Sequence, residues 1–222
     1  MAMDKIIPLG DQAALAYFPD EKSALRFAAA VRRGAAGWLV DIVQAYTSVA
    51  VFFNLEQTDF AHVVQNLRTR ASEPAPSGED IAGRHHCIPC CYELGQDVQR
   101  VAQYAGIALE DVIRLHGETE YTVYAIGFCP GFPYLGYLPA KLCGVPRLET
   151  PRLKVEAGSV GVTGRQTGIY TEPRPGGWNL IGRTPLELVN VADGYFPLRT
   201  GDRVQFERVD EREFEKLRGQ RL

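Results

Sequence analysis

The sequence lacks the features that several common protein classes require. No apolar run approaches the roughly 18 residues of a membrane span, so we expect no membrane segment. No Gly-Lys pair occurs anywhere, which excludes a Walker-type phosphate loop. No Gly-x-Ser-x-Gly sequence occurs either, so nothing indicates a hydrolase with a nucleophile elbow.

The chain also lacks an excess of positive charge and has few cysteines. Lys and Arg number 24 against 27 Asp and Glu, a net charge of −3, so we expect no nucleic-acid partner. Its five cysteines cannot all pair within one chain, and its start shows no basic segment followed by an apolar stretch. We therefore expect reduced thiols and a cytoplasmic protein.

What is present fits an ordinary globular chain of 222 residues, enough for one large domain or two small ones. Residues 72–83 are polar, contain two prolines and show no apolar period, which is typical of a linker. The sequence thus predicts an N-terminal α+β domain over residues 1–83 and a second domain over residues 84–222.

Strands and helices alternate before the linker. Apolar residues recur at helical spacing after Asp20 and after Thr58, and each of these residues could cap a helix. Residues 39–46 and 48–53 are rich in β-formers and nearly adjacent, which predicts a tight hairpin. The order β-α-β-β-α indicates a split βαβ sandwich, a sheet with two helices on one face.

After the linker, glycine and proline are concentrated in residues 127–201. They predict short strands joined by tight turns, and hence a small closed barrel or a sandwich. Two helices are expected first, near residues 98–105 and 109–116. The expected strands are 84–92, 121–126, 159–162, 168–170, 178–181, 186–189 and 203–206.

Three segments of this second half could carry chemistry. Residues 127–139 combine four aromatics with glycine and proline, which gives either a stiff ligand-binding surface or a barrel corner whose aromatics fill the core. In residues 150–168, recurring glycines and cations could bind an anion, or could form β-turns with solvated charges. In residues 175–185, Trp178 offers a stacking face or fills a hairpin core.

One histidine and one cysteine-rich segment complete the candidates. His116 could act as a general base near neutral pH, but its position on an apolar helix face favours a hydrogen-bonded histidine at the core edge. The segment 85–91 contains two His and three Cys but has no second pair of ligands at zinc spacing. We expect no metal site.

Taken together, the motifs of this chain resemble the allophanate hydrolase subunit 1 family, which includes the B subunit of 5-oxoprolinase and the sporulation kinase inhibitor KipI. The resemblance covers nearly the whole chain. It rests on residues 9–13, 126–136, 150–152, 157–161, 166–170, 175–178, 181–185 and 201–206.

The resemblance implies a cyclophilin-like β-barrel as the second domain. It also implies an enzyme complex in which the B subunit works with an A subunit and with a C subunit, the latter related to a biotin-carboxylase-associated subunit. This complex opens 5-oxo-L-proline to L-glutamate at the expense of ATP, with or without Mg. The alternatives are a KipI-like inhibitor that binds a histidine kinase, and a component of allophanate or urea hydrolysis.

A lactam is a poor electrophile, so phosphorylation of its oxygen would help water to attack. On this hypothesis three cations would clamp the phosphate, Arg152, Lys154 and Arg183. His116 would act as a base or as a partner of this clamp. The substrate-binding candidates would hold the lactam amide and form the walls of its pocket. They are Phe128, Phe132, Gln166, Tyr170, Gly176 and Gly177.

Overall fold

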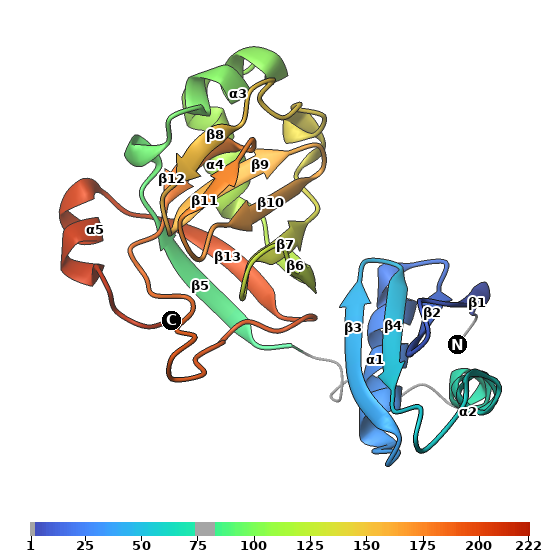
Figure 1. Cartoon of the computed structure of the whole chain (residues 1–222). Helices are drawn as coiled ribbons and strands as arrows, with labels where there is room; N and C mark the ends of the chain where they lie inside the picture. Colours follow the sequence, from blue (N-terminus) through green and yellow to red (C-terminus); the bar gives the residue numbers. More distant parts are fainter. Residues whose placement is uncertain (1–2, 74–82) are drawn as a thin grey trace. The chain divides into compact units, whose positions relative to one another are not determined.

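A computed structural model of the protein describes residues 3–73 and 83–222. The chain divides into two compact units, Met1–Ala82 and Gly83–Leu222, and each is described by itself (Figure 1). The predicted linker, residues 72–83, lies mostly outside the described residues. Both units mix helices with largely antiparallel sheet.

The first unit is a four-stranded antiparallel sheet in the order β1-β2-β4-β3, with two helices. Its strands and helices are β1 (Lys5–Pro8), β2 (Ala13–Tyr17), α1 (Glu21–Arg33), β3 (Leu39–Ala45), β4 (Ser48–Phe53) and α2 (Phe60–Ser72). The helix α1 connects β2 to β3, and β4 lies between these two strands. The predicted hairpin of β3 and β4 is confirmed.

The two helices of this unit begin at aspartates. Asp20 caps α1 as predicted, because its carboxylate accepts a 2.7 Å hydrogen bond from the backbone N–H of Ser23. The predicted cap of α2 is wrong by one residue. Asp59, not Thr58, accepts from the backbone N–H of His62 at 2.8 Å, and the buried Thr58 hydroxyl makes no hydrogen bond with the described residues.

The second unit contains nine strands and three α-helices in its described residues. The first elements are β5 (His85–Cys90), α3 (Val98–Ala105), α4 (Leu109–Glu118), β6 (Tyr121–Ile126) and β7 (Pro133–Gly136). The others are β8 (Arg152–Val155), β9 (Ser159–Thr163), β10 (Gln166–Ile169), β11 (Arg174–Gly176), β12 (Asn179–Arg183), β13 (Arg203–Arg208) and α5 (Glu211–Leu217).

Seven of these strands form a ring. The pairing order is β5-β13-β6-β7-β10-β9-β12, in which only β5 and β13 run parallel. Two backbone hydrogen bonds, from Cys91 N to Arg183 O at 2.8 Å and from Arg183 N to Cys91 O at 2.9 Å, join the two ends. The sheet therefore closes on itself, and β8 and β11 form a separate two-stranded ribbon.

Several sequence-based expectations for this unit need correction. Residues 186–189 form no strand, because their backbone bonds go to the C-terminal segment and to turns; for example, Glu187 N donates to Gln220 O at 2.8 Å. The strands β7, β8 and β11 and the helix α5 were not expected. The helix α5 is fastened by Phe214, which is 2 % exposed.

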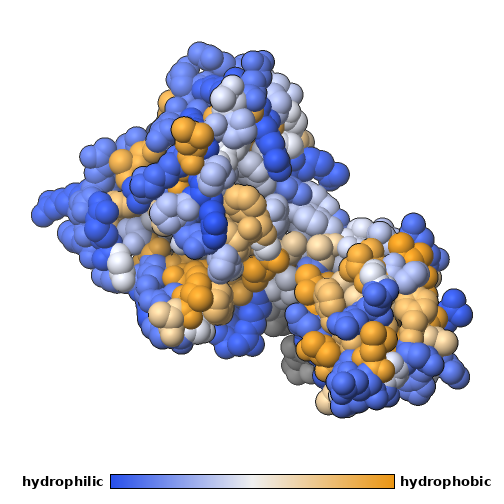
Figure 2. All heavy atoms as spheres, in the orientation of Figure 1, coloured by the Kyte–Doolittle hydropathy of each residue, from blue (hydrophilic) through white to orange (hydrophobic). Residues whose placement is uncertain are grey.

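The interior of the ring is filled as its apolar strands predict. Isoleucine, leucine and valine from the strands pack with Val101 and Val112 of α3 and α4. Figure 2 shows hydrophobic residues scattered among hydrophilic ones on the visible surface of both units. No helix within residues 3–73 and 83–222 is long and apolar enough to cross a membrane.

Candidate functional site

Aromatic side chains line a hollow of about 230 Å³ in the second unit, which we call the aromatic pocket. Phe132 is central to it, because its ring makes edge contacts with four other rings. The ring centroid distances to Phe128, Tyr134, Tyr170 and Trp178 are 5.4, 4.9, 5.3 and 5.6 Å. Such edge-to-face arrangements are favourable for aromatic rings and hold their orientations.

Five of the six predicted substrate-binding residues line this pocket. They are Phe128, Phe132, Tyr170, Gly176 and Gly177. The sixth, Gln166, lies at the start of β10, four residues before Tyr170, or roughly 13 Å along an extended strand. Gln166 is not among the residues that line the pocket.

Two glycines let the aromatic rings approach the backbone. A Cβ on Gly168 would lie 2.9 Å from the Phe132 ring, and a Cβ on Gly176 would lie 2.3 Å from the Tyr170 hydroxyl. Neither ring can yield easily, since Phe132 and Tyr170 are each only 2 % exposed. The absence of a side chain at these positions is therefore what gives the pocket its shape.

Phe128 is held at the edge of the pocket by a strained turn. Its φ is 69°, in the left-handed region that disfavours a residue with a side chain. The backbone N–H of Cys129 donates to Gly127 O at 2.8 Å, so these three residues form a γ-turn of the rare kind with positive φ. The turn leaves Phe128 60 % exposed, and strain of this kind concentrates at functional sites.

Arg147 and two tyrosines supply the polar groups of the pocket. Burial raises the pKa values of the Tyr134 and Tyr170 hydroxyls, and the charge of Arg147 partly opposes this rise in both. The two hydroxyls are therefore neutral at physiological pH. The positive field of Arg147 extends to both.

Arg183 lines a second hollow, of about 220 Å³, which shares Tyr170 with the aromatic pocket. Its Nε donates to the backbone oxygen of Ala157 at 2.9 Å. Lys154 is exposed and pairs with Glu156 at 2.8 Å. The pKa of Glu156 is lowered, mainly by its hydrogen bond with Lys154 and further by the charge of Arg183.

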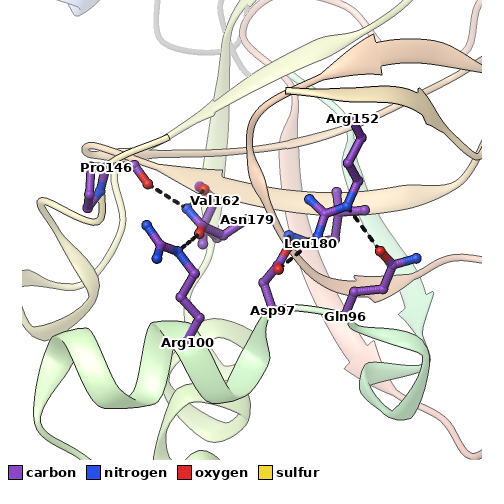
Figure 3. Close-up of polar contacts among 8 residues, drawn as sticks. All are labelled: Gln96, Asp97, Arg100, Pro146, Arg152, Val162, Asn179 and Leu180. Carbon is purple, nitrogen blue, oxygen red and sulfur yellow. Dashed lines mark hydrogen bonds and ion pairs between the residues drawn. The ribbon is translucent and has the colours of Figure 1, made fainter. Parts of the chain in front are cut away.

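Arg152 belongs to a partly buried polar network rather than to either hollow (Figure 3). Its Nη2 donates to both oxygens of Asp97, at 2.8 and 2.9 Å, and its Nε donates to Gln96 at 3.1 Å. Asp97 also accepts from the backbone N–H of Leu180 at 2.7 Å. The structure thus does not bring the three predicted clamp cations, Arg152, Lys154 and Arg183, into one of these hollows.

His116 lies in the core of the ring with no exposed surface. Its Nδ1 is 2.8 Å from the Tyr92 hydroxyl and its Nε2 is 2.9 Å from Thr167 Oγ1. Because Thr167 donates its one proton to Gly161 O, we assign Nε2 as a donor and Nδ1 as the acceptor from Tyr92. Burial lowers the pKa of His116 to about 3, so the imidazole is neutral.

Comparisons with known proteins agree with this architecture. Residues 4–195 match the sequence model of the family described as carboxyltransferase domain, subdomain C and D. Over 188 residues the chain is 38 % identical to the 5-oxoprolinase B subunit of Bacillus subtilis, covering 79 % of this chain and 78 % of that protein. Over 171 residues it is 44 % identical to that of Haemophilus influenzae, covering 76 % and 78 %.

The chain belongs to the family of 5-oxoprolinase B subunits and allophanate hydrolase subunit 1. The predicted family resemblance is thereby confirmed.

Solved structures extend the family comparison. The chain is 33 % identical to a protein called TTHA0988, with a TM-score of 0.78, and the match covers 90 % of this chain but only 40 % of that one. It is 39 % identical to protein PH0987 of Pyrococcus horikoshii, with a TM-score of 0.55 and coverage of 95 % and 100 %. The urea carboxylase of Kluyveromyces lactis, 18 % identical with a TM-score of 0.72, shares the fold; the chain spans 24 % of it.

Sequence reasoning missed part of the pocket of this family member. Tyr134, Pro151, Pro175 and Trp178 lie in segments that the sequence singled out, but they were not named individually as substrate-binding residues. Arg147 was overlooked altogether. Its only signal is an arginine directly after a proline within the glycine- and proline-rich half, which is too weak to separate it from a solvated surface charge.

Replacing Asp97 by alanine tests the buried network. The change removes the acceptor for Leu180 N–H and the partner of Arg152, so we expect the free energy of unfolding to fall by ~3 kcal/mol in chemical denaturation. The exposed pair of Asp111 and Arg114 provides the control, since Asp111→Ala should cost under ~1 kcal/mol. Equal effects of the two changes would contradict the role of Asp97.

A second prediction concerns the pH dependence of stability. The unfolded chain protonates His116 below its ordinary pKa of 6.5, whereas the folded protein keeps it neutral until about pH 3. Stability is therefore lost as the pH falls through this range, by ~2 kcal/mol from this group between pH 7 and pH 5. Denaturation curves of His116→Gln should lack this contribution, and those of the exposed His62→Gln should keep it.

A third prediction tests the glycine that admits Tyr170. Gly176→Ala places a Cβ against a ring that cannot move, so we expect destabilisation by ~2 kcal/mol and altered fluorescence of Trp178. Gly127→Ala is the matched control, because a Cβ there meets nothing within 4 Å. If Gly176→Ala is as stable as Gly127→Ala, the close approach does not shape the pocket.

Proposed function

We propose that this chain is the B subunit of an ATP-dependent 5-oxoprolinase, and that its aromatic pocket binds the lactam ring of 5-oxo-L-proline. The observation that carries the proposal is the identity of 38 % and 44 % to proteins named as B subunits of 5-oxoprolinase, over more than three quarters of each chain. The pocket supports it, because flat aromatic walls suit a small planar amide.

The size of the pocket also fits this substrate. Its volume of about 230 Å³ lies below the roughly 300–1,000 Å³ of pockets that take drug-sized ligands. A five-membered lactam with one carboxylate is correspondingly small. The walls are fixed by the contacts of Phe132 and by the strained turn at Phe128, so little ordering is needed when the ring enters.

The reaction requires more than this chain supplies in one place. Arg152 and Lys154 have carboxylate partners, and Arg183 lines the second hollow rather than the aromatic pocket. These residues do not form a converging clamp for the phosphates of ATP, and we derive no phosphoryl-transfer step through them. We therefore propose that partner proteins, related to the A and C subunits, supply the nucleotide site and the activating phosphate.

The fold assignment can be refined in the same way. We propose that the first unit is the split βαβ domain and the second the cyclophilin-like barrel that the family resemblance implies. The position of β4 between β2 and β3 supports the first assignment. The closure of the second sheet through Cys91 and Arg183 supports the other.

The proposal is tested with the reconstituted complex. The chain is mixed with its A and C partners, and L-glutamate formation from 5-oxo-L-proline is measured with and without ATP and with each component omitted. We expect turnover only in the complete mixture with ATP. Absence of turnover there contradicts the proposal; kinase inhibition or allophanate hydrolysis would then be assayed as the alternatives.

A pocket variant links the activity to this chain. Phe128→Ala removes an exposed wall without opening the core, so we expect KM for 5-oxo-L-proline to rise ~10-fold. Leu153→Ala is the control, since Leu153 is an exposed apolar side chain outside the pocket. An unchanged KM for Phe128→Ala would remove the aromatic pocket from substrate binding.

A further inference from the structure

Arg147 lines the aromatic pocket but, unlike Arg152 and Arg174 nearby, has no carboxylate partner within the described residues. Arg152 pairs with Asp97, and Arg174 pairs with Glu172 at 2.5 Å. Within the described residues, no carboxylate lies within ion-pair distance of Arg147, although it lines the aromatic pocket. The pocket therefore contains a positive charge that the protein itself does not neutralise.

The backbone on both sides of Arg147 is held in place. The preceding carbonyl, Pro146 O, accepts a 2.9 Å hydrogen bond from the Asn179 side chain (Figure 3). The following amide, Leu148 N, donates to Gly177 O at 2.8 Å. Asn179 is itself fully buried and accepts from Arg100 at 2.9 Å. Because the backbone on both sides is held by hydrogen bonds, the exposed Arg147 side chain starts from a fixed position. It is therefore preorganised for a ligand.

The surroundings of Arg147 favour an anion that also has a flat apolar part. The rings of Phe128, Phe132 and Trp178 offer surface to a small ring, while the guanidinium can hold a carboxylate through two parallel hydrogen bonds. No described acidic side chain lines the pocket to repel such a ligand. A neutral ring would contact only the aromatic walls, and the Arg147 guanidinium would stay hydrated.

We propose that Arg147 binds the carboxylate of the substrate and makes the aromatic pocket selective for small lactams that carry a carboxylate over neutral lactams. The inference rests on the proposed function, since it assigns the substrate class of the same pocket. It adds a residue that determines specificity and that the sequence did not single out. The role is binding and orientation of the ligand, not proton transfer.

The test measures binding and turnover separately. Calorimetry on the full chain gives Kd for 5-oxo-L-proline and for the neutral lactam 2-pyrrolidinone, and the reconstituted complex gives kcat and KM. For Arg147→Met we expect Kd and KM for 5-oxo-L-proline to rise roughly 10- to 100-fold, with kcat and the Kd of 2-pyrrolidinone little changed. Arg147→Lys should recover part of the loss.

Arg212→Met is the matched control, because Arg212 is also exposed and lies on α5 away from the pocket. The proposal is overturned if Arg147→Met leaves the Kd of 5-oxo-L-proline unchanged, if both lactams weaken equally, or if the full chain binds neither. A complex that binds 5-oxo-L-proline through Arg147 but does not turn it over would instead contradict the proposed function and leave the binding role intact.

Discussion

The ring of Phe132 lies against the backbone of β10, where Gly168 has no side chain to keep it away. From that position it contacts the rings of Phe128 and Tyr134 in its own segment and those of Tyr170 and Trp178 from later segments. Each contact is weak alone, but together they fix four ring orientations. The walls of the aromatic pocket depend on this one close approach.

The arginines beside the aromatic pocket differ in whether a carboxylate neutralises their charge. Two arginines beside the pocket, Arg152 on β8 and Arg174 on β11, form ion pairs with carboxylates. The Asp97 carboxylate shows the pattern, because it joins Arg152 to the backbone of β12 in a largely buried place. Arg147 stands outside this pairing. Its positive charge lies where the aromatic rings line the pocket.

The family relation and the chemistry of the pocket support each other without being the same kind of observation. Sequence identity places the chain among 5-oxoprolinase B subunits and related proteins. The pocket shows what one member of that family could contribute, a shaped surface for a flat, charged ring. The activating chemistry would come from partners, in line with a protein that binds and orients its ligand.

Local patterns in the sequence determined the elements whose signals are local. The helix after Asp20 follows from apolar period and capping, and α3 and α4 follow from apolar period alone. The hairpin of β3 and β4 follows from two adjacent β-rich runs, and the motifs were enough to predict the family. The aromatic and glycine segments were likewise marked as unusual. Five of the six predicted substrate-binding residues, including Phe132 and Gly176, line one pocket.

Only the tertiary structure decided which charged and polar groups are available. Arg152 looked like a phosphate ligand, but its partner Asp97 lies 55 residues away in sequence. His116 looked like a base, but it has no exposed surface, and its two ring nitrogens are hydrogen-bonded to Tyr92 and Thr167 in the core. Arg147 showed only a weak signal, an arginine directly after a proline. The partner of a charged side chain depends on packing between residues that are distant in sequence. Apolar period and capping depend on a few neighbouring residues, so these local features can be predicted from the sequence whereas the partners cannot.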